Sequence, residues 1–108
     1  MDKVSSVNEV IASMKARFHP EACKELQASY QWMISGNGGR DFSVQISNGT
    51  FRVVDGVLPD PSVTFQTDIQ TYLRLVNGDI KAMTAILTRK LNVRGNIYLA
   101  SKMDNIFK

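Results

Sequence analysis

The sequence contains a single cysteine, Cys23, and a single histidine, His19. One cysteine excludes an intramolecular disulfide and a metal site built from several thiolates, and it favours a reducing compartment. Because no second histidine stands at metal-ligand spacing, we expect His19, directly before Pro20, to be a capping or surface residue. Catalysis at neutral pH usually needs a tuned acid or base beside a nucleophile or a metal. We therefore expect a protein that is not an enzyme and that holds no metal or cofactor.

Long hydrophobic runs are also absent. No segment approaches the ~18 apolar residues needed to span a bilayer, and the first residues lack the basic-then-apolar pattern of a signal peptide. We therefore expect a cytoplasmic protein. The chain is 44% hydrophobic and 21% charged, which is ordinary for a globular protein. A length of 108 residues suits one domain, which we expect to cover residues 1–108.

Acidic residues are scarce in the C-terminal part of the chain. Residues 1–68 carry 6 basic and 8 acidic side chains, whereas residues 69–108 carry 7 basic and 2 acidic ones. Such a basic end attracts anionic membranes or acidic partners, but it equally serves as a solvated surface. Nucleic-acid binding is disfavoured because the aromatic residues fall on predicted inward faces, apart from the basic ones.

Hydrophobic periodicity places a helix first and strands after it. Ser6 to Glu9 reads as a capping box, and an apolar stripe at helical spacing follows over residues 7–18. Strands with alternating apolar residues are expected at 26–35, at 42–47 and after Asn48-Gly49. Asn-Gly is a strong signal for a type I′ hairpin, so Ser47 should face Thr50 and Ile46 should face Phe51.

The second half of the sequence alternates between helices and strands. Residues 62–67 read as a strand, and Asp68 offers a cap for a helix that ends at Asn77-Gly78. Asp79 is expected to cap a further helix, residues 90–94 to form the last strand, and Gly95-Asn96 to start a terminal helix. The order is thus one helix, a meander of about four strands, two helices, a strand and a helix, which is an α+β sheet covered on one face.

These features, in this order, resemble the sterol carrier protein-2 (sterol transfer) family. The resemblance rests on the hairpin at 46–49, on Pro59-Asp60-Pro61-Ser62-Val63-Thr64-Phe65, and on Lys90-Leu91-Asn92-Val93-Arg94-Gly95-Asn96 with the helix after it. It implies an α+β fold whose five-stranded, mainly antiparallel sheet has helices on one face and an apolar tunnel between them. It also implies non-catalytic binding, and possible transfer, of a sterol, fatty acid, fatty acyl-CoA or isoprenoid.

Carried over to this chain, the resemblance assigns the tunnel wall to apolar residues of both layers. The sheet would contribute Trp32, Ile34, Phe42, Val44 and Phe65, and the helices Leu73, Val76, Met83, Ile86, Leu87, Leu99 and Met103. The same side chains would fill a dry core equally well. The alternative is therefore a scaffold on the same fold that supports a lipid-handling pathway through protein contacts.

The terminal helix is the expected lid of this tunnel, because chain ends are weakly ordered unless packing holds them. Its neighbouring basic residues could meet an anionic membrane during transfer. The expected partners are thus one long-chain lipid and, transiently, a membrane surface, with no nucleic acid. We expect a monomer or a weak dimer.

Overall fold

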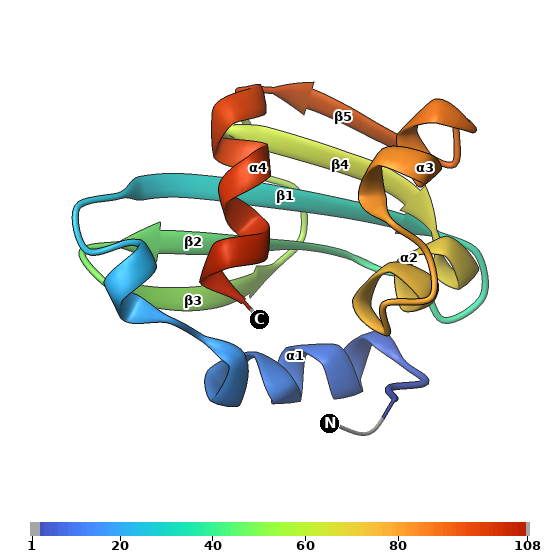
Figure 1. Ribbon diagram of the computed structural model, residues 1–108, viewed down its shortest axis with the longest axis horizontal. Coiled ribbons are helices and arrows are strands. Elements are labelled where there is room, and N and C mark those ends of the chain that lie inside the picture. The colour runs from blue at the N-terminus through green and yellow to red at the C-terminus, as the bar shows by residue number, and fades with distance from the viewer. Residues whose placement is uncertain (1–2, 108) are drawn as a thin grey trace.

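The computed structural model describes residues 3–107 and has ten elements of secondary structure around one sheet (Figure 1). The helices are α1 (Val7–Arg17), α2 (Ile69–Val76), α3 (Ala82–Leu87) and α4 (Ile97–Ile106), with a short 3-10 turn at Pro20–Ala22. The strands are β1 (Gln27–Ser35), β2 (Asp41–Ser47), β3 (Thr50–Asp55), β4 (Val63–Asp68) and β5 (Leu91–Gly95). This confirms the predicted α+β class and the order of the elements.

The five strands lie in the order β3-β2-β1-β4-β5, and all neighbours are antiparallel except β1 and β4. The predicted meander of four strands is therefore wrong at its last step. β4 does not continue beside β3, because the chain crosses the sheet and pairs β4 parallel to β1, with Tyr30 opposite Val63. Pro59 and Pro61 of the connecting segment have no backbone N–H group, so this segment cannot form a further hydrogen-bonded strand beside β3.

The hairpin between β2 and β3 has the predicted register. Ser47 pairs with Thr50 and Ile46 with Phe51, around Asn48 and Gly49 with φ of 52° and 78°. Positive φ at both central positions is what a type I′ turn requires, and it is the reason that Asn-Gly occurs there. The apolar residues of both strands consequently face the same side.

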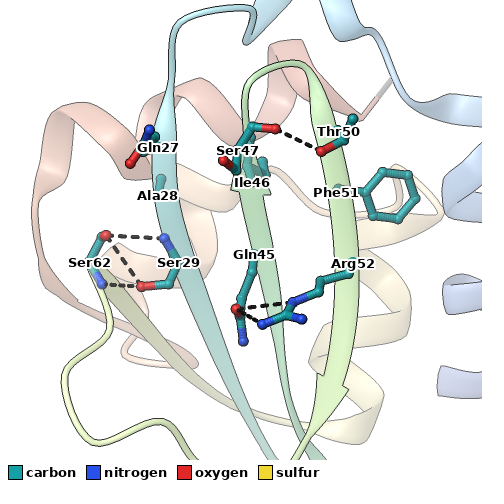
Figure 2. A pocket seen from close by; sticks show the side chains of 10 residues that line it. All are labelled: Gln27, Ala28, Ser29, Gln45, Ile46, Ser47, Thr50, Phe51, Arg52 and Ser62. Atoms are coloured by element: carbon teal, nitrogen blue, oxygen red, sulfur yellow. Dashed lines mark hydrogen bonds between the residues drawn. The ribbon is translucent and has the colours of Figure 1, made fainter.

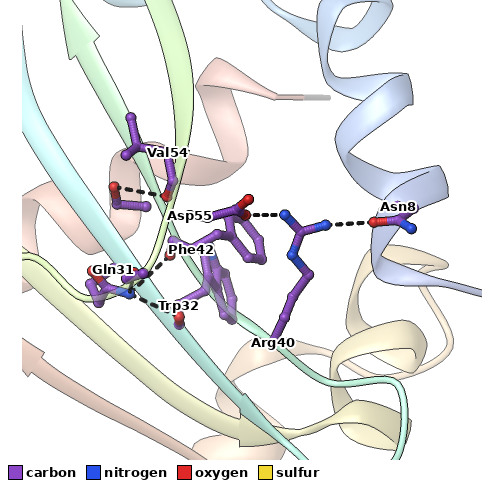
Figure 3. A network of polar contacts seen from close by, with 9 residues as sticks. Asn8, Gln31, Trp32, Arg40, Phe42, Val54 and Asp55 are labelled. Atoms are coloured by element: carbon purple, nitrogen blue, oxygen red, sulfur yellow. Dashed lines mark hydrogen bonds and ion pairs between the residues drawn. The ribbon is translucent and has the colours of Figure 1, made fainter.

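All four helices lie on one face of the sheet (Figure 1). The predicted caps Ser6 and Asp68 are confirmed, and Asn96, where the last helix was expected to start, caps α4. Each side chain accepts a hydrogen bond from a backbone amide three residues ahead. The carboxylate of Glu9 accepts from the backbone of Ser5, one residue earlier than a capping box places it. Arg40 binds both Asn8 of α1 and Asp55 of β3, which joins the first helix to the sheet (Figure 3).

The segment from β3 to β4 crosses the opposite, outer face of the sheet (Figure 1). The side chain of Gln31, 1% exposed, fastens this crossing segment to the sheet. Its amide nitrogen donates to the carbonyl oxygen of Gly56 at 2.9 Å, and its oxygen accepts from the backbone amide of Leu58 at 2.9 Å. The side chain of this buried glutamine thus supplies hydrogen bonds to backbone groups of the crossing segment, which has no neighbouring strand to provide them.

Candidate functional site

The five sheet residues predicted for the ligand site all lie buried on the helix-covered face. Trp32 pairs with Phe42 on one side and with Phe65 on the other. The rings of Trp32 and Phe65 stack with their centroids 4.3 Å apart. These positions, together with Ile34 and Val44, form a continuous apolar surface at the centre of the sheet.

Four of the seven predicted helix residues pack against this surface. Leu73 and Val76 of α2, and Leu99 and Met103 of α4, are half-buried and contact the core. Their partial exposure distinguishes them from the sheet residues. They therefore lie at the boundary between the core and the surface.

The predicted inward orientation of Met83, Ile86 and Leu87 is wrong. These side chains are 64%, 39% and 75% exposed, whereas Ala85, between them, is fully buried. α3 has only six residues and packs against β5, and the small methyl group of Ala85 permits a close approach that a larger side chain would prevent. The predicted cap is also wrong: Asp79 pairs with Lys3 at 2.7 Å, and the helix begins after Lys81 without a side-chain cap.

Tyr72 of α2 is a central residue of the site that the ligand prediction omitted. It is 1% exposed, and its ring meets the indole of Trp32 edge-on with centroids 4.9 Å apart. Burial raises the pKa of the Tyr72 hydroxyl well above its ordinary value, and the positive charge of Arg17 opposes this rise in part. Its position in an apolar helical stripe predicted burial, but nothing in the sequence placed it beside Trp32.

Two buried hydrogen-bond donors in this region have no acceptor among the described residues. They are the indole nitrogen of Trp32 and the Nε atom of Arg17. A terminal nitrogen of Arg17 reaches the carbonyl oxygen of Phe107 only at 3.5 Å. Trp32 itself is 8% exposed. Buried polar groups normally find partners, so these two donors call for an explanation.

The surface has two depressions, and neither is lined by Trp32, Phe42, Phe65 or Tyr72. One, of about 440 Å³, is lined mainly by polar side chains such as Ser29, Gln45 and Arg52 (Figure 2). The other, of about 560 Å³, lies near Asp68 and Lys90. Within the first, Ser29 bonds Ser62 and Gln45 bonds Arg52. Neither depression is the predicted tunnel, which stays a prediction.

The residues that carry chemistry elsewhere are few. No group of three or more histidine, cysteine, aspartate or glutamate side chains within residues 3–107 is arranged to hold a metal ion. Cys23 is buried, and burial raises the pKa of its thiol. His19 lies 3.1 Å from Glu21 at the surface. In the same range, no helix combines the length and the apolar character of a membrane span.

Comparison with solved structures shows the same fold in several proteins. Palmitated SCP2L2 from Aedes aegypti, in solution, matches with a TM-score of 0.76 at 23% identity, over 94% of each chain. A double mutant of a sec-alkyl sulfatase matches with a TM-score of 0.86 at 13% identity, over 96% of this chain but 16% of that one. At these identities the likeness concerns the fold. It shows the same architecture both alone and as a small part of a larger protein.

Sequence comparison gives relatives that are much longer than this chain. Hydroxysteroid dehydrogenase-like protein 2 of Xenopus tropicalis is 26% identical over 106 residues, which are 94% of this chain and 25% of the relative. The rat protein of the same name is 26% identical over 102 residues, or 20% of its length. The chain thus spans about a quarter or less of these curated relatives. The model of the SCP-2 sterol transfer family matches residues 7–108, and the chain belongs to this family.

Proposed function

We propose that the protein binds one lipid molecule, with a long apolar chain and an oxygen-bearing head, between the inner face of the sheet and the helices. Family membership supports lipid binding and transfer in general. A structural neighbour of the same length is described as palmitated, which is the ligand class that we propose here. The role is binding or transfer without catalysis.

The observation that carries this proposal is that two buried donor atoms, Trp32 Nε1 and Arg17 Nε, have no hydrogen-bond partner among the described residues. Leaving a buried donor unsatisfied costs about 1–3 kcal/mol. An oxygen atom of a ligand head would remove this cost, whereas a hydrocarbon would not. A carboxylate would in addition pair with the positive charge of Arg17.

The apolar chain of the ligand would contact the nine predicted residues that the structure brings together. Trp32, Ile34, Phe42, Val44 and Phe65 would form the floor, and Leu73, Val76, Leu99 and Met103 the roof. The flexible side chain of Met103 suits ligands of varying shape. Roughly 0.8 kcal/mol per buried CH₂ group makes a long acyl chain sufficient for tight binding.

Trp32 is the only tryptophan of the chain, so its fluorescence reports directly on this site. Titration with a long-chain fatty acid should change the emission and saturate at one ligand per protein. The alkane of the same length should bind more weakly, because it cannot accept a hydrogen bond from either donor. No saturable binding of several lipid classes would favour the alternative, a scaffold that acts through protein contacts.

Variants separate the two donors from the apolar wall. Trp32→Phe and Arg17→Met should each lower fatty-acid affinity about fivefold to 100-fold, as expected for loss of one buried hydrogen bond, and leave alkane affinity nearly unchanged. Because the Trp32→Phe variant lacks the fluorescent indole, native mass spectrometry should be used to measure the affinities for the acid and for the alkane. Arg74→Met, on the exposed side of α2, is the matched control and should change neither affinity. Equal losses for acid and alkane would contradict head-group recognition.

A further inference from the structure

The segment from Ile80 to Met103 contains no acidic residue. It carries five basic ones, namely Lys81, Arg89, Lys90, Arg94 and Lys102. Four of them are exposed, and the ammonium group of Lys102 lies 5.2 Å from the centre of the Tyr98 ring. This segment comprises α3, β5 and the first two turns of α4, which begins beside β5 and then runs across the strands (Figure 1). The basic residues therefore belong to elements that meet at the β5 edge of the sheet.

Large apolar side chains are exposed along the same edge. α3 exposes Met83 and Leu87 at 64% and 75%, and α4 exposes Ile97 and Tyr98 at 65% each. Both helices contact β5, which pairs only with β4 within the sheet and is therefore an edge strand. We call the surface formed by these four residues and the five basic ones the edge face. Exposed clusters of large apolar residues usually mark an interaction surface.

The charge of the edge face decides between its possible occupants. A second copy of the chain, paired through β5, would bring five cations on each side together without an acidic residue in this segment to balance them. An anionic bilayer provides acyl chains for the apolar side chains and negatively charged phosphates for the basic side chains. Side chains such as Met83, Leu87 and Ile97 enter the boundary between head groups and acyl chains, while basic neighbours contact the phosphates.

We propose that the edge face docks on membranes that contain anionic lipids. Two side chains that the sequence placed inside the site, Met83 and Leu87, thus belong to a surface that meets the bilayer. Docking does not rest on the proposed ligand, because all its contacts lie outside the buried core. The test can therefore use the protein without ligand, and its failure would leave ligand binding untouched.

Flotation with vesicles tests the proposal. The protein should bind vesicles of phosphatidylcholine and phosphatidylserine, bind vesicles of phosphatidylcholine alone far more weakly, and dissociate from the anionic vesicles at high salt. Lys90→Gln with Arg94→Gln should weaken binding to the anionic vesicles roughly 25-fold, as expected for two basic residues near such a surface. Lys15→Gln with Lys24→Gln, two exposed lysines outside the edge face, is the control and should have little effect.

A second pair of variants tests the apolar part of the edge face. Met83→Ser with Leu87→Ser should weaken vesicle binding about tenfold or more, because these side chains no longer enter the bilayer. Val57→Ser, which removes a 58% exposed apolar side chain from the outer face, should not. All these positions are exposed, and thermal unfolding followed by circular dichroism verifies folding. Equal binding of the variants and the parent protein, or no binding to anionic vesicles, would overturn the proposal.

Discussion

The hydroxyl group of Tyr30, on the central strand β1, donates a hydrogen bond of 2.7 Å to the backbone carbonyl oxygen of Leu99 in α4. A second tie holds the other end of this helix: the backbone amide of His19 donates to the carbonyl oxygen of Ile106 at 2.8 Å, and Phe107 packs against Phe18 and Phe51. The terminal helix is therefore held at its C-terminal end by a hydrogen bond and aromatic packing, and near its N-terminal end by the Tyr30 hydrogen bond. If it acts as a lid, the end that opens is the one that begins at Ile97.

Removing the Tyr30 hydroxyl should loosen this lid. Tyr30→Phe leaves the ring in place and should lower the free energy of unfolding by about 1 kcal/mol, the usual net value of such a bond. It should also speed release of bound lipid, because α4 then separates from β1 more easily. Urea unfolding and stopped-flow displacement measure the two effects. Tyr98→Phe, at a 65% exposed position, should show neither, and equal effects at both sites would contradict the assignment.

The same hydroxyl makes stability sensitive to high pH. Burial raises the pKa of Tyr30 from about 10 to about 12, and burial also raises that of Tyr72. A group whose pKa is higher in the folded state stabilises the protein below the unfolded-state pKa and loses this effect as pH rises toward the folded-state value. The free energy of unfolding should therefore fall as pH rises from 10 toward 12. Urea titrations across this range should show a smaller fall for Tyr72→Phe, and a flat profile would contradict the prediction.

Gln31→Ala should detach the crossing segment from the outer face. The amide of Leu58 and the carbonyl of Gly56 would lose their partners, at an expected cost of about 2–3 kcal/mol in unfolding free energy. Gln45→Ala on the neighbouring strand is the control. Gln45 bonds Arg52 at the surface, where water replaces the lost contact, so this cost should stay below about 0.5 kcal/mol. Chemical unfolding measures both, and similar losses would refute the role assigned to Gln31.

Gly95→Ala should be much more costly than Gly56→Ala, although both glycines have φ of +99°. A Cβ atom at position 95 would lie 2.4 Å from the backbone oxygen of Ser62, whereas one at position 56 meets nothing within 4 Å. The difference isolates steric overlap from backbone strain, and we expect it to be about 1–3 kcal/mol in unfolding free energy. Equal costs would mean that the chain around Ser62 can shift.

The sequence predicted the features that depend on local spacing. Asn48-Gly49 fixed the hairpin register, and alternation identified the buried side of each strand, including Trp32 and Phe65. The sequence could not identify the parallel pairing of β1 with β4, because the alternation of apolar and polar residues in a strand does not depend on which neighbour the strand joins. A short helix such as α3 was similarly ambiguous, since six residues do not define which side packs inward.

The orientation of α3 changes what Met83→Glu should do. An inward Met83 would have placed a carboxylate among apolar groups and cost lipid affinity. At a 64% exposed position the change should alter the free energy of unfolding by less than about 0.5 kcal/mol and leave lipid affinity nearly constant. Leu73→Glu, in the half-buried roof, should reduce both. A strong loss of lipid affinity for Met83→Glu would restore this residue to the ligand site.

The crossing of the chain over the outer face also affects the order in which the strands are expected to pair during folding. β1, β2 and β3 are joined by short turns, whereas pairing of β1 with β4 brings together residues such as Tyr30 and Val63 across the whole hairpin. Closing the longer loop costs more entropy, so we expect this pairing to be the slow step of folding. Trp32 and Phe65 stand on opposite sides of that seam. We therefore expect the floor of the proposed lipid site to form only when β4 joins β1, and ligand binding to follow that step.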